Sequence, residues 1–403
     1  MRIVDVNEFY SPTGGGVRTY VDRKIALLAA MGHELIVIAP GREDRVEERP
    51  GGGAVHYVKS PGMPFDANYG LFWDAAPIHR RLDALLPDVI ENCSPWRSAW
   101  IASGWQDPRP AHARGAAIRA FFMHNDNVES YPKRWLRPVA SGARIERAFA
   151  WYDRYLGRCL DRYDTVVTNG PSLTRRLTGR GVRVDATMPL GIERSHFSPA
   201  LRDEGLRAAL LQQCGLPPQA HLLLGVGRHH PEKRWPTVID AVQRAGAQVP
   251  VGLVILGQGI DTRTLERHIG DNPHIRLFLP VYERRRLASI MASADAYIHG
   301  CGTETFGLVP AEALASGTPL IVPDGGGTAE IADAPFAEVY AERDVRSCAA
   351  AILRMLSRDR SLVRRAAGVA AAGVRSDVEH AADLVAHYAG VIAARDGSIR
   401  RSA

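Results

Sequence analysis

The stretch from Asp295 to Pro323, DAYIHGCGTETFGLVPAEALASGTPLIVP, contains the pattern that decides the fold. It has a short apolar run at each end and a helical pattern between them, which predicts a strand–helix–strand unit with parallel strands. We expect the helix to begin near Thr305 or Phe306. We expect it to end at Ser316–Pro319, where a glycine acts as the cap and a proline prevents continuation.

The same alternation of apolar runs and amphipathic helical patterns occurs twice along the 403 residues. The two series are separated by TMPLGIERSHFSPAL, whose prolines and glycine are typical of a linker. We therefore predict an α/β protein with two parallel-sheet domains, at residues 1–195 and 196–375, followed by a C-terminal helix and tail at 376–403. A chain of this length is long enough for two hydrophobic cores.

The composition, with 46% hydrophobic and 23% charged residues, is that of a soluble globular protein. No apolar run reaches the roughly 18 residues that cross a bilayer, and the N-terminus enters a strand pattern directly, which predicts a cytoplasmic protein. The five cysteines include no C-x-x-C pair, and the chain has neither an H-E-x-x-H motif nor a D-x-D triplet. A bound metal is therefore not indicated.

Positive charge is concentrated between Arg109 and Arg183, where fifteen Lys and Arg residues stand against six Asp and Glu residues. Such an excess is typical of a surface that meets an anionic partner, although a solvated basic face has the same composition. Aromatic residues lie among the basic ones between Phe121 and Arg158. This mixture favours an anionic membrane surface. Nucleic acid is not expected as a partner, because no nucleic-acid-binding motif accompanies the charge.

Two glutamates eight positions apart, Glu304 and Glu312, lie on either side of Gly307. A glycine at a helix start exposes backbone N–H groups, and the helix dipole adds attraction for an anion. Carboxylates are good acceptors for vicinal hydroxyls, and eight residues of helix span about 12 Å. This arrangement suits a nucleoside diphosphate sugar laid along the helix. The spacing alone is also compatible with one exposed and one capping glutamate.

Two cations follow the apolar run LLLGVG: Arg228 directly after it and Lys233 five residues later. Breaking a sugar–phosphate bond leaves negative charge on the departing diphosphate. Without a bound metal, fixed cations and a helix start must stabilise that charge. We expect both side chains to face the same phosphate site.

Several segments resemble, in the expected order, the GT4 family of retaining glycosyltransferases, also called group 1, which have the GT-B fold of two Rossmann-like domains facing across a cleft. ETFGLVPAEALASGTPLIV resembles the family's E-x7-E signature, and GVGRHHPEKRW its G-R-x4-K segment. PLGIERSHFSP resembles the interdomain segment, with Leu190 and Glu193 replacing the usual asparagine and aspartate. PTGGGVRTYV, followed by MGHEL, resembles the N-terminal glycine loop and helix. The resemblance covers most of residues 1–375.

The resemblance implies a set of site residues. The catalytic residues implied are His124, Arg228, Lys233 and Glu304. The implied donor-binding residues are Gly15, Gly16, Val281, Phe306, Gly307, Leu308, Val309 and Glu312. Acceptor contacts are expected from Arg18, Asp126 and Asn127. No metal ligand is implied, and the C-terminal helix is expected to pack back on the N-terminal domain.

The resulting prediction is a cytoplasmic retaining hexosyltransferase that needs no cofactor. It would move a sugar from a UDP- or GDP-linked donor to a hydroxyl of a lipid, lipid-linked or glycan acceptor, at the inner face of the membrane. Two alternatives stay open: another GT-B nucleotide-sugar enzyme, such as a glucan synthase or an epimerase, and a catalytically silent binding scaffold. A nicotinamide-dependent oxidoreductase is disfavoured, because no G-x-G-x-x-G follows the first strand. The sequence leaves the base, the sugar, the acceptor and the oligomeric state open.

Overall fold

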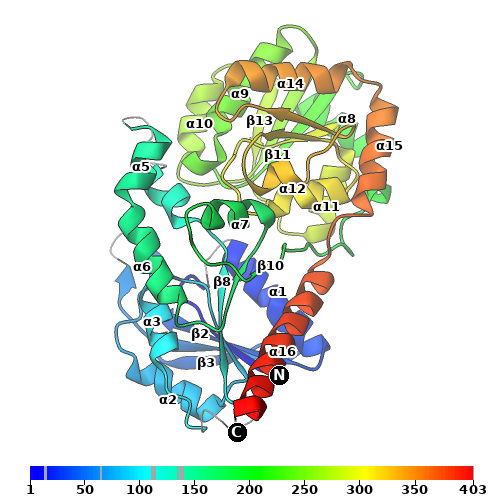
Figure 1. Ribbon diagram of the computed structural model, residues 1–403. Helices are drawn as coiled ribbons and strands as arrows, with labels where there is room; N and C mark the ends of the chain where they lie inside the picture. The colour runs from blue at the N-terminus through cyan, green and yellow to red at the C-terminus, as the bar shows by residue number, and fades with distance from the viewer. Residues whose placement is uncertain (13–15, 64–65, 110–114, 134–135, 137–139, 403) are drawn as a thin grey trace. The chain divides into compact units, whose positions relative to one another are not determined.

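The structure is a computed structural model that describes residues 1–12, 16–63, 66–109, 115–133, 136 and 140–402 (Figure 1). The chain forms two compact units. The first unit consists of Met1–Pro189 together with Val378–Ala403, and the second of Leu190–Asp377. Each unit has its own mainly parallel sheet, so the predicted fold class of two Rossmann-like domains is confirmed.

The sheet of the first unit has the strand order β10-β9-β8-β7-β1-β2-β4-β3. Its strands are β1 (Arg2–Val6), β2 (Glu34–Gly41), β3 (Arg45–Glu48), β4 (Ala54–Lys59), β7 (Val89–Asn92), β8 (Ile118–Met123), β9 (Thr165–Thr168) and β10 (Ala186–Thr187). A separate hairpin is formed by β5 (Gly62–Met63) and β6 (Asp66–Gly70). All pairs in the large sheet are parallel except β3 with β4, an edge pair that the sequence prediction lacked. The sequence RVEE of β3 is short and charged, which is typical of an edge strand.

The helices of the first unit are α1 (Gly16–Ala30), α2 (Ala76–Leu85), α3 (Arg97–Gly104), the π-helical turn Glu129–Lys133, α5 (Gly142–Ala148), α6 (Ala150–Leu160), α7 (Pro171–Thr178) and α16 (Asp377–Ser402). The C-terminal helix α16 packs on this unit, as predicted (Figure 1). Its Tyr388 hydroxyl donates to Glu91 Oε2 at 2.5 Å, and His387 Nε2 lies 2.8 Å from Thr165 Oγ1. These contacts attach the C-terminal end of the chain to β7 and β9.

The sheet of the second unit has the order β13-β12-β11-β14-β15-β16 and is parallel throughout. Its strands are β11 (His221–Val226), β12 (Val251–Leu256), β13 (Ile275–Phe278), β14 (Ala296–Ile298), β15 (Leu320–Pro323) and β16 (Ala337–Tyr340). The surrounding helices are α8 (Glu204–Gln213), α9 (Trp235–Gly246), α10 (Thr262–Ile269), α11 (Arg284–Ser293), α12 (Leu308–Ala315), α13 (Gly326–Glu330), α14 (Val345–Ser357) and α15 (Arg360–Ala371).

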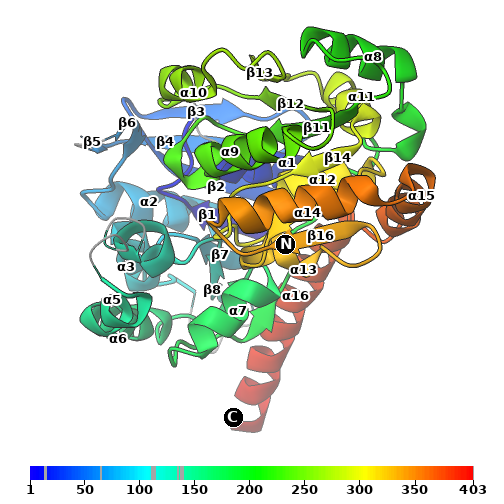
Figure 2. The ribbon, with the colours of Figure 1, turned by 90° about the horizontal axis from the view of Figure 1, so that it is seen from above.

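Both faces of this second sheet are covered by helices. Helices α9 and α14 lie side by side over one face, where they pack on Leu223 (Figure 2). Helices α8, α11, α12 and α15 share the other core with Leu222 and Leu224. Neighbouring strand residues point to opposite faces, so an unbroken apolar run such as LLL is what a sheet covered on both sides requires.

The two segments at the ends of the second unit are paired with each other. Ile192 and Ser376 form a parallel bridge, in which Ile192 N–H donates to Arg375 O at 3.0 Å and Asp377 N–H donates to Ile192 O at 2.9 Å. Gly191 allows this approach, because a Cβ there would lie 2.0 Å from Ser376 O. The chain therefore enters and leaves the unit at one place.

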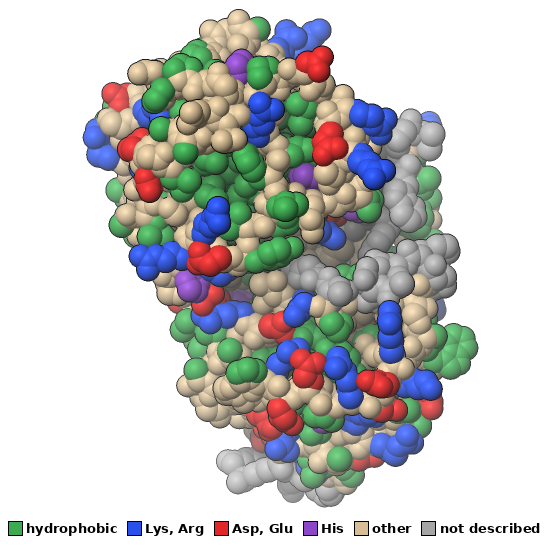
Figure 3. Space-filling model, turned by 180° about the vertical axis from the view of Figure 1, so that it is seen from behind, with side chains coloured by type: hydrophobic (Ala, Val, Ile, Leu, Met, Phe, Trp, Pro, Cys, Tyr) green, Lys and Arg blue, Asp and Glu red, His purple; other side chains and the backbone are tan. Residues whose placement is uncertain are grey.

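Charged side chains of both signs are interspersed over the face that Figure 3 shows. All five cysteines are buried and unbridged. None of the described helices combines the length and the apolar character that a membrane-spanning segment requires.

Candidate functional site

The loop between β14 and α12 carries the first part of the candidate site. The helix begins at Leu308, slightly later than expected, because Gly307 is its N-cap in a left-handed conformation with φ 89°. A Cβ on Gly307 would lie 2.8 Å from Thr328 Cγ2, so glycine is required at this position. Glu304 therefore lies in the loop before the helix. The predicted distance between Glu304 and Glu312 assumed that the whole stretch between them is helical. The helix begins only at Leu308, so the rise per helical residue applies only from there onward.

Lys233, His299 and Glu304 meet at this loop. Lys233 ends the 3₁₀ turn Pro231–Lys233, and His299 directly follows β14. Lys233 Nζ donates to Glu304 Oε1, and His299 Nε2 lies 3.6 Å from the same oxygen. Burial alone would raise the pKa of Glu304, but Lys233 and His299 hold that pKa well below its usual range. Burial would lower the pKa of Lys233, but the Glu304 charge raises it to about 12. Both groups of the pair are therefore ionised.

His299, Cys301 and Glu304 offer ligand atoms within 4.8 Å of one another, the one such group in the part of the chain that the structure describes. The donor set is a poor match for a metal ion. The Lys233 ammonium already bonds the carboxylate, and burial raises the pKa of the Cys301 thiol, so that the thiolate is disfavoured. A side-chain cation thus supplies the positive charge at this position.

Arg228 lies after β11 on the same loop as Lys233. Its side chain is 63% exposed and bonds Glu232 Oε1 at 2.8 Å, while its carbonyl accepts from Trp235 Nε1 at 3.0 Å. The backbone is thus fixed by a buried ring. A surface pair of this kind is worth little, so the guanidinium can turn toward an incoming anion at small cost.

Glu312 lies inside α12 and is 7% exposed. Arg284 Nη2 donates to Glu312 Oε1 at 2.8 Å, and the Arg284 guanidinium lies 4.9 Å from the centre of the Phe197 ring. Burial raises the pKa of Glu312, and Arg284 opposes this rise. Sequence reasoning missed Arg284. Its position in the sequence offered one clue. Arg284 is the first residue of α11, and a cation at the start of a helix is unfavourable unless an acidic side chain pairs with it.

Four apolar residues of the predicted donor site, Val281, Phe306, Leu308 and Val309, are partly buried and pack against the core of the second unit. Residues 279–282 form the loop that we expect to contact the base. Its Leu279 and Tyr282 side chains are exposed. Val281, between them, is partly buried against the core and anchors this loop.

A glycine triplet that sequence reasoning missed contacts the backbone of Glu304. The residues Gly325–Gly327 follow β15, and Gly327 N–H donates to Glu304 O at 2.7 Å. A Cβ on Gly326 would lie 2.6 Å from the same carbonyl oxygen. Three glycines after a strand were the available sign of a close backbone approach.

His124 lies in the first unit, directly after β8. Its ring packs against Tyr20 and Phe122, with ring centres 4.9 and 4.6 Å away. Burial, with smaller contributions from the charges of Lys24 and His380, lowers the pKa of His124 to about 3. The imidazole is therefore neutral and suited to hydrogen bonding rather than to ion pairing.

The side chains of Asp126 and Asn127 are buried. Arg180 donates to both oxygens of Asp126, at 2.9 and 3.0 Å, and Asn127 Nδ2 donates to the Tyr152 hydroxyl at 2.7 Å. These side chains stabilise the first unit. Their geometry gives no support to the predicted acceptor contacts.

Arg18, the third predicted acceptor contact, bonds Asp22 Oδ2 at 3.2 Å one turn further along α1. Gly16 is the first residue of α1. Gly15 lies outside the described residues.

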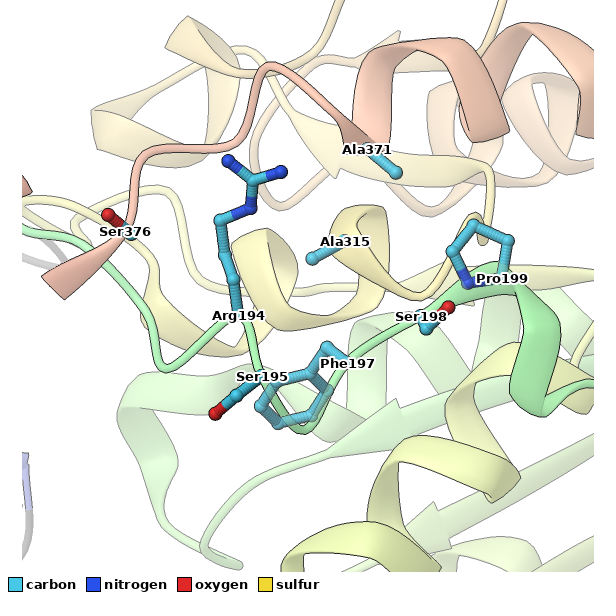
Figure 4. Close-up of a pocket in the computed structure, with 8 residues that line it drawn as sticks. All are labelled: Arg194, Ser195, Phe197, Ser198, Pro199, Ala315, Ala371 and Ser376. Atoms are coloured by element: carbon cyan, nitrogen blue, oxygen red, sulfur yellow. The ribbon is translucent and has the colours of Figure 1, made fainter. Parts of the chain in front are cut away.

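The second unit also contains a hollow of about 450 Å³ (Figure 4). It is lined by Arg194, Ser195, Phe197, Ser198, Pro199, Ala315, Ala371 and Ser376. Ala315 is the last residue of α12, whereas the anion site is expected at the first turn. The hollow contains neither Glu304 nor Glu312 and is therefore separate from the candidate site.

The fold and the site together define a class: a glycosyltransferase of the GT-B fold. Residues 14–188 match the family model described as Glycosyltransferase Family 4, and residues 207–370 match the one described as Glycosyl transferases group 1. The chain is 31% identical to a GDP-mannose-dependent alpha-mannosyltransferase of Mycobacterium tuberculosis, over 82% of this chain and 81% of that protein. The chain therefore belongs to the GT4, or group 1, family of glycosyltransferases, and the predicted family and enzyme class are confirmed.

Another relative is a GDP-mannose-dependent alpha-(1-6)-phosphatidylinositol dimannoside mannosyltransferase of Mycobacterium tuberculosis, 30% identical over 91% of each chain. Among solved structures, a sucrose-phosphate synthase of Thermosynechococcus elongatus superposes with a TM-score of 0.73 at 19% identity, covering 98% of this chain and all of that one. The Anabaena protein HepE in complex with UDP gives 0.71 at 14% identity, covering 97% of this chain and all of that one. At these identities the solved structures show the fold.

Proposed function

We propose that this enzyme transfers mannose from GDP-mannose, with retention of anomeric configuration and without a metal ion, to a hydroxyl of a lipid, lipid-linked or glycan acceptor. The observation that carries the proposal is the Lys233–Glu304 pair beside the glycine-capped start of α12. The names of the two relatives at about 30% identity support GDP-mannose as the donor.

Each site residue of the second unit is assigned its own role in binding or catalysis. The exposed N–H groups at the start of α12, Lys233 and Arg228 bind the diphosphate and stabilise the charge that develops as it departs. Glu304 accepts hydrogen bonds from the sugar, and Glu312 from the ribose hydroxyls. Because protein cations and a helix start supply the positive charge, the reaction requires no divalent ion.

Retention follows when the acceptor attacks from the face that the diphosphate leaves. The bond between sugar C1 and the phosphate oxygen breaks, the bond between C1 and the acceptor oxygen forms, and the acceptor proton passes to the departing phosphate. Glu304 is not a nucleophile in this scheme, because the acceptor oxygen attacks C1 directly and Glu304 only accepts hydrogen bonds from the sugar. The neutral His124 is assigned a hydrogen bond to the transferred sugar, as the family resemblance implies.

The donor assignment is tested by calorimetry with GDP, UDP, GDP-mannose and UDP-glucose, followed by transfer assays in the presence of EDTA. We expect GDP and GDP-mannose to bind, activity to survive EDTA, and proton NMR to show an α-linked product. Preferential binding of UDP-glucose contradicts the donor, loss of activity in EDTA contradicts the metal independence, and a β-linked product contradicts retention. Binding without any transfer or hydrolysis indicates the silent scaffold.

The two glutamates are expected to differ in their kinetic roles. Glu312→Ala should raise the KM for the donor by tenfold or more, because a hydrogen bond to a charged group contributes about 1.5–3 kcal/mol. Glu304→Ala should mainly lower kcat, by about a hundredfold, because it positions the reacting sugar. Steady-state kinetics measures both, with Glu266→Ala on the exposed side of α10 as the control. Unchanged kinetics in both variants would remove the site assignment.

We also propose that the first unit binds an anionic membrane surface through a basic stripe on α5 and α6. The stripe consists of Arg144, Arg147, Trp151, Arg154 and Arg158, all of them exposed, and Trp151 is 55% exposed. Within α6, Trp151, Arg154 and Arg158 are three and four residues apart, which is the spacing of one helix face. The opposite face of α6 is buried in the core through Tyr152, Leu156, Cys159 and Leu160. Arginines flanking an exposed tryptophan match an anionic interface chemically.

Vesicle flotation tests this surface. The wild type should float with vesicles that contain anionic lipid and not with neutral ones at low salt. Replacing two stripe arginines (Arg147→Gln with Arg154→Gln) should weaken binding by about 2 kcal/mol, roughly 30-fold, at about 1 kcal/mol per cation. Arg263→Gln with Arg267→Gln, on the exposed face of α10, is the matched control. A wild type that shows no preference for anionic vesicles overturns the membrane proposal and leaves the donor assignment standing.

A further inference from the structure

We infer that His299 is a positioning residue that orients the Glu304 carboxylate toward the transferred sugar once the donor diphosphate has drawn Lys233 away. The inference rests on the proposed function and adds a residue that the family motif does not contain. It depends on three contacts, made by Lys233, His299 and Tyr297.

The first observation is that two groups compete for one oxygen. Lys233 Nζ bonds Glu304 Oε1, and His299 Nε2 lies 3.6 Å from the same atom, too far for a full hydrogen bond. His299 is 2% exposed, and among the described residues its Nε2 has no hydrogen-bond partner. A buried polar atom of this kind requires an explanation, and a carboxylate 3.6 Å away provides one.

The second observation fixes the tautomer. His299 Nδ1 lies 3.2 Å from the Tyr297 hydroxyl, whose single proton can be donated either to Nδ1 or to Val226 O, which is 3.4 Å away. If Nδ1 carried the proton, the Nε2 lone pair would face the ionised Glu304 and be repelled. The favourable arrangement has the Tyr297 hydroxyl donating to Nδ1 and the Nε2–H pointing at Glu304. Burial lowers the pKa of His299, which keeps the ring neutral with one N–H to donate.

The third observation concerns Lys233. Its ammonium has three donors, and the developing charge on a diphosphate is a stronger attraction than the charge of a single carboxylate. When Lys233 turns to the phosphate, Glu304 loses its main partner while it must hold the sugar. A shift of a few tenths of an ångström then brings Nε2–H into hydrogen-bond distance of Glu304. The carboxylate keeps its orientation because His299 is itself fixed by burial.

A pair of variants tests the inference. His299→Leu removes the donor at similar volume, and His299→Gln restores an N–H near the position of Nε2. We expect His299→Leu to lower kcat by about a hundredfold and to abolish the extra affinity that the mannosyl group adds over GDP, with the affinity for GDP unchanged. His299→Gln should recover most of both losses. Calorimetry with GDP and GDP-mannose and steady-state kinetics measure these effects, with His274→Leu as the control.

Each other outcome overturns the inference. An unchanged kcat in His299→Leu means that Glu304 needs no second partner, and an equal loss of GDP affinity means that the histidine only supports the fold. A glutamine variant as inactive as the leucine variant excludes the donor role. If His299→Leu does not fold, Tyr297→Phe is the variant that tests the inference. The inference then requires that Tyr297→Phe lowers kcat and leaves the affinity for GDP unchanged. The failure of the proposed function is distinct, because the wild type itself would then bind GDP-mannose no better than GDP and transfer no mannose.

Discussion

Lys233→Met should lower kcat by about a hundredfold to a thousandfold, the effect of removing one fixed donor from a site of developing negative charge. The lysine is assigned to the departing diphosphate, and the loss therefore falls on the bond-breaking step. The same substitution leaves the Glu304 carboxylate without its ammonium partner, which raises the pKa of Glu304 toward its usual range. Activity of the variant should consequently fall at a higher pH than activity of the wild type, as Glu304 becomes protonated.

Steady-state kinetics across pH 4 to 8, a range that covers the usual pKa of glutamate, measures both effects. Lys59→Met is the matched control, because Lys59 is exposed at the end of β4 in the other unit. A Lys233→Met enzyme with wild-type kcat would show that the diphosphate is stabilised by other groups. An acid limb identical to that of the wild type would show that Lys233 does not control the ionisation of Glu304.

Arg207→Met should destabilise the second unit by about 3–5 kcal/mol, because it leaves a buried carboxylate without its nearest cation, while Arg202 and Arg360 lie further away, at 3.7 and 3.6 Å. Arg207, on α8, is 3% exposed and donates to both oxygens of Asp295, with Nη2 2.6 Å from Oδ2. It also donates to the carbonyls of Pro218 and Ala220. The substitution therefore takes one donor from each of three acceptor groups at once.

Urea unfolding followed by circular dichroism measures this loss, with Arg263→Met on α10 as the exposed control. Adding Asp295→Asn to the variant should recover part of the stability, since the uncompensated charge is then gone. Burial opposes ionisation of Asp295, but Arg207 holds its pKa below the usual 3.8. The pair therefore stabilises the fold above about pH 4, and the difference between wild type and variant should shrink as the pH falls below that value. Equal stability of Arg207→Met and Arg263→Met would contradict this account.

The central strands of both sheets were predictable because their residues are buried on two faces. Runs such as LLLGV and VGLVIL are apolar without alternation, which is typical of a short strand covered by helices on both sides. The edge strand β3 was not predicted. Its sequence RVEE is charged and resembles a loop, and it becomes a strand only because β4 offers an unpaired edge.

Helix α12 has one end that the neighbouring sequence predicts and one end that it does not. Its C-terminal end was predicted at Ser316–Pro319, and Gly317 is indeed left-handed with φ 71°. Its start was placed too early, because the position of the N-cap depends on Gly307 packing against Thr328, a residue that follows the next strand. A contact with a residue that far along the chain cannot be predicted from the sequence around the start of the helix.

The sequence by itself determined the fold class, because apolar periodicity is written along the chain, and its resemblance to the family motifs made Lys233, Glu304 and Glu312 candidate site residues. Only the tertiary structure decided which groups these residues contact. It paired Lys233 with Glu304, set His299 beside the same carboxylate, and joined Arg284 to Glu312. Two of these pairs, Lys233–Glu304 and Arg284–Glu312, join residues from different segments, and burial of the surrounding core fixes their distances and their charges.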